Sequence, residues 1–439
     1  MKFKPYVEYL TLTFFLKWCR GIVGGLLSIL AIGILFITRK QKGSLLLMKS
    51  IRISPHSFST AALKKILPMD FGPYLQNDVL MEEACQRSII LSLPTTNNGK
   101  IKKGVLLITF TRTFAYYLNQ PNFILFDKYF IFVLEPSWSG YADPEILSFI
   151  VRAEHCLVQA TEQQDTTLLN ALFPEGVATS FGASDWVNPD KFRPDNVVKQ
   201  YDSIYVANMN PIKRVYRYID AIERISQSWP EYKGCLVCAG WGGAKESIER
   251  YLASKNLSKN LVFIPGLEQV ELIKIINQSK VNILLSLKEG SNRSLFESMF
   301  LDVPAICISE NIGVNKSYIN EFTGLLISDS FLEDALISMR ENWISYRPRA
   351  WALKNISPNA TTAKLANLLE LKFGAICNST LSVKSNNPEV EYLDEDIDHV
   401  EILTRLFSAI KESDEQIFWK HVEGTKLTRR KVDPNFSDR

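Results

Sequence analysis

Two carboxylates at a set spacing are the residues of this sequence best suited to chemistry. Glu289 and Glu297 lie eight positions apart, and the apolar run 281–287 comes just before Glu289. This order predicts a strand, a short polar loop and a helix capped by Ser291 or Asn292. The N–H groups at such a helix start favour a phosphate or diphosphate, and the flanking carboxylates would accept hydrogen bonds from sugar hydroxyls. The alternative to a ligand site is that Glu289 only caps the helix and Glu297 lies on its solvated face.

A second polar loop brings two cations to the end of another predicted strand. Residues 203–209 form an apolar run, and Lys213 and Arg214 follow it where a helical pattern begins. Both cations would make charge-assisted hydrogen bonds with diphosphate oxygens from the opposite side of the ligand. Gly240 and Gly242, after the next predicted strand, would let the backbone approach a ligand closely. The alternative for the two cations is a solvated surface pair.

Apolar runs that alternate with helical patterns must position these loops. Several runs are continuous and do not alternate in polarity, which is typical of parallel strands covered by helices on both faces. We therefore predict an α/β fold with two doubly wound Rossmann-like domains, residues 50–194 and 195–376. The predicted strands are 88–93, 104–110, 129–135, 156–160 and 176–181, then 203–209, 234–239, 260–265, 281–287, 303–309 and 324–327. Ligands of such sheets bind at the carboxyl ends of the strands.

The front of the chain, residues 1–49, has a different character. Residues 21–38 contain no charge, and as a helix they would span about 27 Å, close to the hydrocarbon thickness of a bilayer. We predict a transmembrane or membrane-anchoring helix. Basic residues flank the run on both sides, and their slight excess after it favours a cytoplasmic body. The alternatives are a buried core helix and a start of translation at Met48.

Residues 377–439 change in composition again, with an acidic run, one amphipathic stripe and a basic end. The apolar residues of the stripe are Leu403, Leu406, Phe407 and Ile410. We interpret this part as a partly ordered appendage and not as a third domain. Residues 394–398 imitate an Asp-x-Asp metal motif, but their place in an acidic tail indicates solvated charges. No metal site is predicted.

The composition limits the classes of protein to consider. The 439 residues include 50 Lys and Arg against 47 Asp and Glu, a formal net charge of +3, which gives no electrostatic case for a nucleic-acid partner. With 46% hydrophobic and 22% charged residues, fibrous and disordered classes are excluded. Seven scattered cysteines indicate reduced thiols. Cys235 and Cys238 would point to opposite faces of one strand as core thiols.

From about residue 154 to 371 the chain resembles the retaining family-4 glycosyltransferases of the GT-B fold, which are glycosyl transferases group 1. The resemblance rests on ordered motifs in this part of the sequence. These motifs are the Glu-x7-Glu signature of Glu289 and Glu297 with the helix, turn and strand that follow at 299–305, the Thr-Gly-Leu-Leu stretch at 323–326, and the segment 176–194, which is similar to the family's connection between the two lobes.

The resemblance implies a donor site for a nucleotide sugar in the second domain. Glu289 would hold hydroxyls of the transferred sugar, and Lys213 would neutralise the diphosphate as the sugar leaves. Glu297 would bind the ribose. The other donor-binding residues would be Asn208, Arg214, Gly240, Gly242, Gly290, Ser291 and Asn292. The sequence departs from the family's pattern at Asn208, where Arg is common, and at 290–292, where Gly-Phe-Gly is common.

These features predict a membrane-anchored, metal-independent glycosyltransferase that moves a sugar with retention from a nucleotide-diphosphate donor to a glycan or lipid-linked acceptor, in cell-envelope or polysaccharide biosynthesis. No cofactor besides the donor and no nucleic-acid partner is expected. Glu135 and Trp138 follow a strand of the first domain and are, by position, acceptor-side candidates. The alternatives are a sugar-nucleotide epimerase on the same fold and a non-catalytic binding or scaffold protein.

Overall fold

The protein is described here by a computed structural model, and its structure divides into two compact units. The described residues are 15–37, 40–67, 75, 78–97, 99–239, 243, 245–290, 292–384 and 397–425. Leaving aside residues 1–17, which the division groups with the first unit, Val187–Ser357 form what we call the continuous unit, and Trp18–Trp186 together with Pro358–Arg439 form the discontinuous unit. These limits differ from the predicted division, in which the second domain began at 195 and a separate tail began at 377.

The continuous unit is built on a parallel six-stranded sheet in which the strand order reverses once. The order is β10-β9-β8-β11-β12-β13. Strands β9 and β10 are therefore added on one side of β8, and β11 to β13 on its other side. All six predicted strands of this part are present. They are β8 (Ser203–Asn208), β9 (Gly234–Ala239), β10 (Leu261–Pro265), β11 (Asn282–Leu284), β12 (Ala305–Ile308) and β13 (Gly324–Ile327). A reversal of this kind opens a crevice at the carboxyl ends of the two central strands.

Helices cover both faces of this sheet, as predicted for a doubly wound domain. One face packs against α10 (Val215–Ser228), α11 (Lys245–Ser254) and α14 (Leu332–Asn342), and the other against α12 (Gln269–Asn277), α13 (Arg293–Phe300) and α15 (Pro348–Asn355). Cys238 lies in the first core and Cys235 in the second. Burial raises the pKa of each thiol to about 12. The prediction that these two cysteines are core thiols on opposite faces is therefore confirmed.

The sheet of the discontinuous unit has a different topology from the prediction. Its order is β1-β4-β5-β6-β7, with β1 antiparallel to β4 and the other pairs parallel. The strands are β1 (Ser88–Ser92), β4 (Gly104–Thr109), β5 (Phe130–Glu135), β6 (Cys156–Gln159) and β7 (Ala178–Thr179). From β4 onward each described strand is added on the same side. Right-handed crossovers then bring every crossover helix to one face, so the prediction of a doubly wound first domain is wrong.

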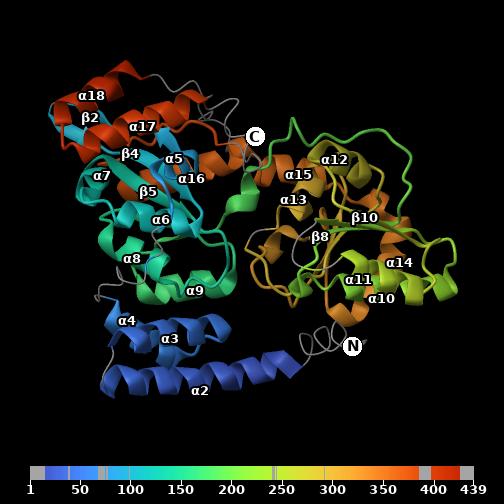
Figure 1. Cartoon of the computed structure of the whole chain (residues 1–439). Coiled ribbons are helices and arrows are strands. Elements are labelled where there is room, and N and C mark those ends of the chain that lie inside the picture. The colour runs from blue at the N-terminus through green and yellow to red at the C-terminus, as the bar shows by residue number, and fades with distance from the viewer. Residues whose placement is uncertain are drawn as a thin grey trace. The chain divides into compact units, whose positions relative to one another are not determined.

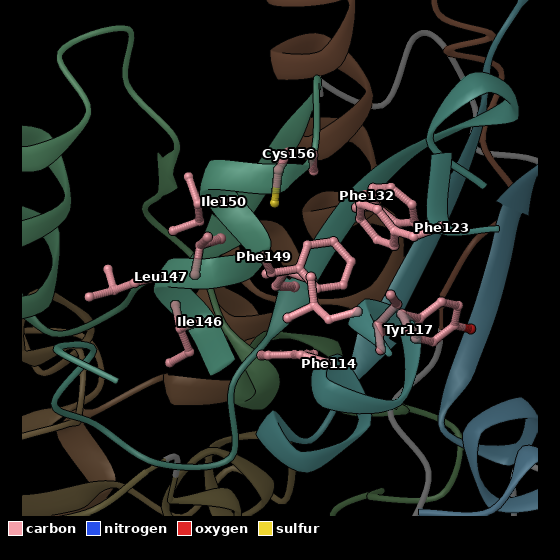
Figure 2. Close-up of a cluster of buried hydrophobic side chains, with 14 of the residues drawn as sticks. Phe114, Tyr117, Phe123, Phe132, Ile146, Leu147, Phe149, Ile150 and Cys156 are labelled. Atoms are coloured by element: carbon pink, nitrogen blue, oxygen red, sulfur yellow. The ribbon is translucent and has the colours of Figure 1, made fainter. Parts of the chain in front are cut away.

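The core of that one face is rich in aromatic rings. The crossover helices are α6 (Thr111–Leu118), α7 (Phe123–Tyr129), α8 (Pro144–Arg152) and α9 (Gln163–Leu172). Figure 2 shows the rings of Phe123, Phe132 and Phe149 packed together between these helices and β5. Phe123 stacks on Phe132 with centroids 5.7 Å apart, and Phe149 meets the edge of Phe132 at 4.9 Å. Such pairs stabilise beyond the area that they bury.

The chain returns from the continuous unit to cover the opposite face. Helix α16 (Pro358–Phe373) contributes Leu365 and Leu369 to a core with residues of β1, β4, β5 and β6. Cys377 and Leu381, just beyond the helix, are part of the same core. A sheet with all its crossover helices on one face needs such a cover, because its other face is equally apolar. Residues 358–381 therefore complete the core of a sheet whose strands lie nearly two hundred residues or more earlier in the sequence.

The predicted C-terminal appendage is in fact partly core. Helices α17 (Ile397–Lys411) and α18 (Glu415–Gly424), red in Figure 1, belong to the discontinuous unit. The amphipathic stripe predicted at residues 403–410 is buried, as an amphipathic helix on a core should be. Most of the acidic run, which extends from residue 389 to 401, lies outside the described residues, and its last part begins α17. The interpretation of residues 394–398 as solvated charges therefore stays a prediction.

Replacement of Phe407 by alanine is expected to lower the free energy of unfolding by about 3–5 kcal/mol. The Phe407 ring lies edge-on to Tyr117 at 5.4 Å and to Phe126 at 4.9 Å, so its removal leaves a cavity between them. Urea denaturation measures the loss. Arg405→Ala on the exposed side of the same helix is the control and should stay within about 0.5 kcal/mol; equal stabilities of both variants and the wild type would restore the appendage interpretation.

The N-terminal helices form a hairpin and a third helix within the discontinuous unit. They are α2 (Phe15–Ile37), α3 (Lys40–Ile53) and α4 (Ser57–Ile66). The predicted apolar segment 21–38 falls almost wholly within α2, where residues 19–37 have a mean hydropathy of 2.2. By length and composition this helix is able to cross a membrane, which is weak support for an anchor.

Candidate functional site

The loops after β8 and β11 meet at the point where the strand order of the continuous unit reverses. After β8 the chain makes one turn of 3₁₀ helix, η3 (Pro211–Lys213), which Asn210 caps by accepting a hydrogen bond from Ile212 N at 3.1 Å. After β11 the chain continues through Ser286 and Glu289 to the start of α13. The two loops are joined directly, because Leu287 N donates to Ile212 O at 3.2 Å.

Lys213 and Glu289 form an ion pair at this junction. The Lys213 Nζ lies 2.6 Å from each carboxylate oxygen of Glu289, and the two side chains are only 16% and 6% exposed. Glu289 Oε1 also accepts hydrogen bonds from Ser286 Oγ and, at 3.3 Å, from Asn292 Nδ2. The carboxylate is thus held in one orientation by three neighbours, and the ammonium is held between the two loops.

A third loop, after β12, supports Glu289 from behind. Glu289 N donates to Ile312 O at 2.8 Å, and Asn311 Nδ2 donates to Ser286 O at 2.7 Å. Gly313 has φ +114°, and a Cβ at this position would lie 1.9 Å from Glu289 O. Only glycine therefore lets this loop approach Glu289 so closely. Nothing in the sequence singled out Gly313, Asn311 or Ser286, since each acts only through proximity in the fold.

Helix α13 begins as predicted at Asn292. Its Oδ1 accepts a hydrogen bond from Leu295 N at 2.9 Å, which confirms Asn292 as the N-cap. The cap directs the free N–H groups of the first turn toward the carboxyl edge of the sheet. Gly290, in the loop before the cap, is half-buried, and the other predicted cap, Ser291, lies outside the described residues.

Glu297 lies in the second turn of α13 and is 5% exposed. Arg293 Nη2 lies 3.2 Å from its Oε1. Burial raises the pKa of the Glu297 carboxyl, and the charges of Arg293 and Lys191 lower it in part. In this structure the carboxylate is therefore engaged within its own helix, and its predicted contact with a ribose stays a prediction.

Arg214 does not lie in the loop pair, contrary to its predicted place in the donor site. Its side chain is fully buried, with Nη2 2.7 Å from Asp329 Oδ2 and Nη1 donating to Leu285 O at 3.2 Å. Its left-handed backbone, with φ +56°, ends η3 and starts α10. The physical reason for the correction is that the buried guanidinium is engaged by Asp329 and Leu285 O, and Asp329 is shared with Arg217, whose Nε lies 3.3 Å from its Oδ1.

Arg214→Met is expected to lower the free energy of unfolding by about 1–3 kcal/mol, because Asp329 and Leu285 O lose a buried donor while Arg217 still pairs with Asp329. Binding of nucleotide by the folded fraction should be unchanged. Urea denaturation and calorimetry measure the two quantities. Arg224→Met is the control, since Arg224 is 63% exposed and pairs with Glu333 on the surface; it should cost less than about 1 kcal/mol. A stable Arg214 variant that no longer binds nucleotide would return Arg214 to the donor site.

The structure places the remaining predicted residues in three different settings. Asn208, at the end of β8, is buried and accepts a hydrogen bond from Asn210 N at 3.0 Å, so it shapes the turn before Lys213. Gly240 and Gly242 lie outside the described residues. Glu135 and Trp138 belong to the discontinuous unit, where Glu135 is buried and pairs with Lys384 Nζ at 2.9 Å.

Sequence comparison identifies the domain that carries the Lys213–Glu289 pair. Residues 188–355 match the family Glycosyl transferases group 1. The match covers less than half of the chain and almost the whole of the continuous unit. It supports a GT-B glycosyltransferase, as the resemblance predicted, whereas assignment to family 4 and retention of configuration stay predictions. A search of curated proteins found no match.

Several solved structures are similar to part of the chain. TarM is 17% identical over 64% of this chain and 62% of its own, with a TM-score of 0.46. Sucrose-phosphate synthase from Thermosynechococcus elongatus is 17% identical over 62% and 74%, with a TM-score of 0.46. HepE from Anabaena, in complex with UDP, is 13% identical over 60% and 78%, with a TM-score of 0.48. The chain spans less than two thirds of TarM, and similarity at this level specifies no substrate for it.

Among the described residues, no group of three or more His, Cys, Asp or Glu side chains is arranged to hold a metal ion. The groups joined at Glu289 are its carboxylate, the Lys213 ammonium, the Ser286 hydroxyl and the Asn292 carboxamide. Such a set binds a ligand that carries both negative charge and hydroxyl groups. A sugar joined to a diphosphate has both.

Proposed function

We propose that the protein is a retaining glycosyltransferase that takes a sugar from a nucleotide-diphosphate donor and passes it to a glycan or lipid-linked acceptor. The observation that carries the proposal is the Lys213–Glu289 pair at the strand reversal of a glycosyl transferases group 1 domain. We also propose that the body of the protein is cytoplasmic, at a membrane to which the N-terminal helices bind, and that it acts in cell-envelope or polysaccharide biosynthesis.

Each residue of the pair has a separate task in this proposal. As the sugar leaves, negative charge develops on the diphosphate, and the Lys213 ammonium stabilises it without the need for a metal ion. Glu289 accepts hydrogen bonds from hydroxyls of the transferred sugar. Its other partners, Ser286 and Asn292, keep the carboxylate oriented while Lys213 exchanges one of its hydrogen bonds for a phosphate oxygen.

A screen of nucleotide sugars with mass-spectrometric detection tests the proposal. The expected products are a free nucleoside diphosphate and a new glycoside, with the anomeric configuration of the donor retained. An isomerised sugar nucleotide without release of nucleoside diphosphate would instead support an epimerase. Absence of nucleotide binding by calorimetry at millimolar concentration would support a non-catalytic binding protein.

A further inference from the structure

One side of helix α2 is exposed and apolar from Ile22 to Ile37. The exposed side chains recur with the period of a helix and are Ile22, Val23, Leu26, Ile29, Leu30, Phe36 and Ile37. The opposite side is covered, because Ser28 and Ala31 are fully buried. A face of this size and character is seldom left uncovered in a soluble protein.

The covered side of α2 packs lengthwise against α3. Ser28 Oγ and Ser50 Oγ share a hydrogen bond of 2.8 Å near the middle of the hairpin. Near one end, a Cβ on Gly24 would lie 2.8 Å from Ser54 Cβ, and near the other a Cβ on Gly43 would lie 3.0 Å from Ala31 O. The two glycines and the serine pair therefore hold the hairpin together between Gly24 and Ala31 of α2.

Helices α3 and α4 are in turn bound to the starts and ends of crossover helices of the same discontinuous unit. Arg52 Nη1 lies 3.1 Å from Asp143 Oδ2, and Lys64 Nζ donates to Ala171 O at 3.3 Å. If α2 crossed a bilayer with this hairpin intact, the exposed Lys49 of α3 would enter the hydrocarbon, because the adjacent Ser50 lies level with Ser28 in the middle of the apolar stretch. A charged side chain is costly at that depth. The packing therefore disfavours a span and favours a helix that lies along the membrane surface.

The charge of this region points to the kind of membrane surface. From residue 9 to residue 69 the sequence contains nine Lys and Arg and no Asp or Glu, although the whole chain carries only +3. Lys42, Lys49, Lys64 and Lys65 are exposed on α3 and α4. Apolar side chains that enter the acyl boundary beside cations that bind headgroups are the combination that holds an interfacial helix on an anionic leaflet.

We propose that α2 is an in-plane anchor, whose exposed apolar face inserts into one leaflet of an anionic bilayer while the α2–α3 hairpin stays folded. Of the two predicted modes, a transmembrane or a membrane-anchoring helix, the proposal selects the second. The proposal is independent of the transferase activity, since it concerns only the N-terminal helices and a lipid surface.

Sedimentation of the full-length protein with vesicles is the first test. The wild type should bind vesicles of equimolar phosphatidylcholine and phosphatidylglycerol much more strongly than phosphatidylcholine alone, and added salt should weaken binding. Leu26→Gln with Leu30→Gln should weaken it by roughly tenfold or more, and Lys42→Gln with Lys49→Gln by about fivefold per lysine. Val198→Gln with Leu371→Gln, at apolar residues elsewhere that are even more exposed, is the matched control and should bind like the wild type.

The depth of spin labels in the bilayer separates an in-plane helix from a span. Labels are placed at Leu26→Cys and Phe36→Cys in a Cys19→Ser background, where the six remaining cysteines are buried. The same shallow depth at both positions is expected. A label at the bilayer centre for residue 26 together with an interfacial one for residue 36 would overturn the proposal in favour of a span. Unchanged binding of the Leu26 and Leu30 variant, or self-association without any vesicle binding, would overturn it as well.

Discussion

Lys213→Ala is expected to lower kcat for sugar transfer by roughly 10²–10³-fold. The lost ammonium is the cation that lies closest to the Glu289 carboxylate, and the developing charge on the leaving diphosphate then has no positive partner at this loop. Donor turnover measured at saturating donor gives the effect. Lys274→Ala is the control, since Lys274 is 60% exposed and pairs with Glu271 on the surface of the same unit.

A double variant separates catalysis from stability in this experiment. Lys213→Ala alone leaves the buried Glu289 carboxylate without its counter-ion, which is expected to cost about 3–5 kcal/mol of unfolding free energy. Lys213→Ala with Glu289→Gln removes that unpaired charge and should recover most of the stability while transfer stays lost. Full kcat in a folded Lys213→Ala variant would refute the role proposed for this lysine.

Gly313→Ala is expected to reduce transfer by roughly a hundredfold although Gly313 touches no substrate in the proposed mechanism. Its new Cβ would overlap the carbonyl of Glu289, so the loop after β12 must withdraw and the hydrogen bond from Glu289 N to Ile312 O must break. The effect should appear in kcat more than in KM, because Glu289 is displaced while the diphosphate-binding lysine remains.

Gly266→Ala is a matched control for that variant. Gly266 has φ +87°, and the nearest atom to its added Cβ is 3.9 Å away. It therefore suffers the strain of a left-handed backbone, about 1–2 kcal/mol, without a collision. Thermal unfolding and kcat of the two variants are compared. Equal losses of activity in both would mean that backbone strain, and not the approach to Glu289, accounts for the effect.

The strands were predictable from sequence because burial on both faces gives continuous apolar runs. The runs at 203–209 and 234–239, for example, correspond closely to β8 and β9. The direction of β1 was not predictable, since its residues are all buried and an antiparallel strand buried on both faces has the same pattern as a parallel one. The stripe at 403–410 indicated a buried helix face but carried no information about which residues cover it.

The positions of candidate residues were predictable where they follow directly from local structure, whereas their roles stay predictions. Asn292 after a strand predicted a cap, and Lys213 and Glu289 after two strands predicted a shared ligand edge that the structure brings together. Arg214 was placed wrongly because it is next to Lys213, which faces the loop pair. The left-handed backbone of Arg214 turns the chain, so its guanidinium lies beside Asp329 instead. Gly313 was missed because it is 24 positions from Glu289 in the sequence.

The return of the chain through α16 has a consequence for synthesis on the ribosome. The continuous unit, residues 187–357, is complete before α16 emerges, so it can fold first. At roughly 5–20 residues per second, the earlier sheet waits on the order of ten seconds or more for the helix that covers its second apolar face. During this interval the uncovered face of that sheet is open to chaperones and to aggregation. Chains truncated before α16 should therefore be poorly soluble.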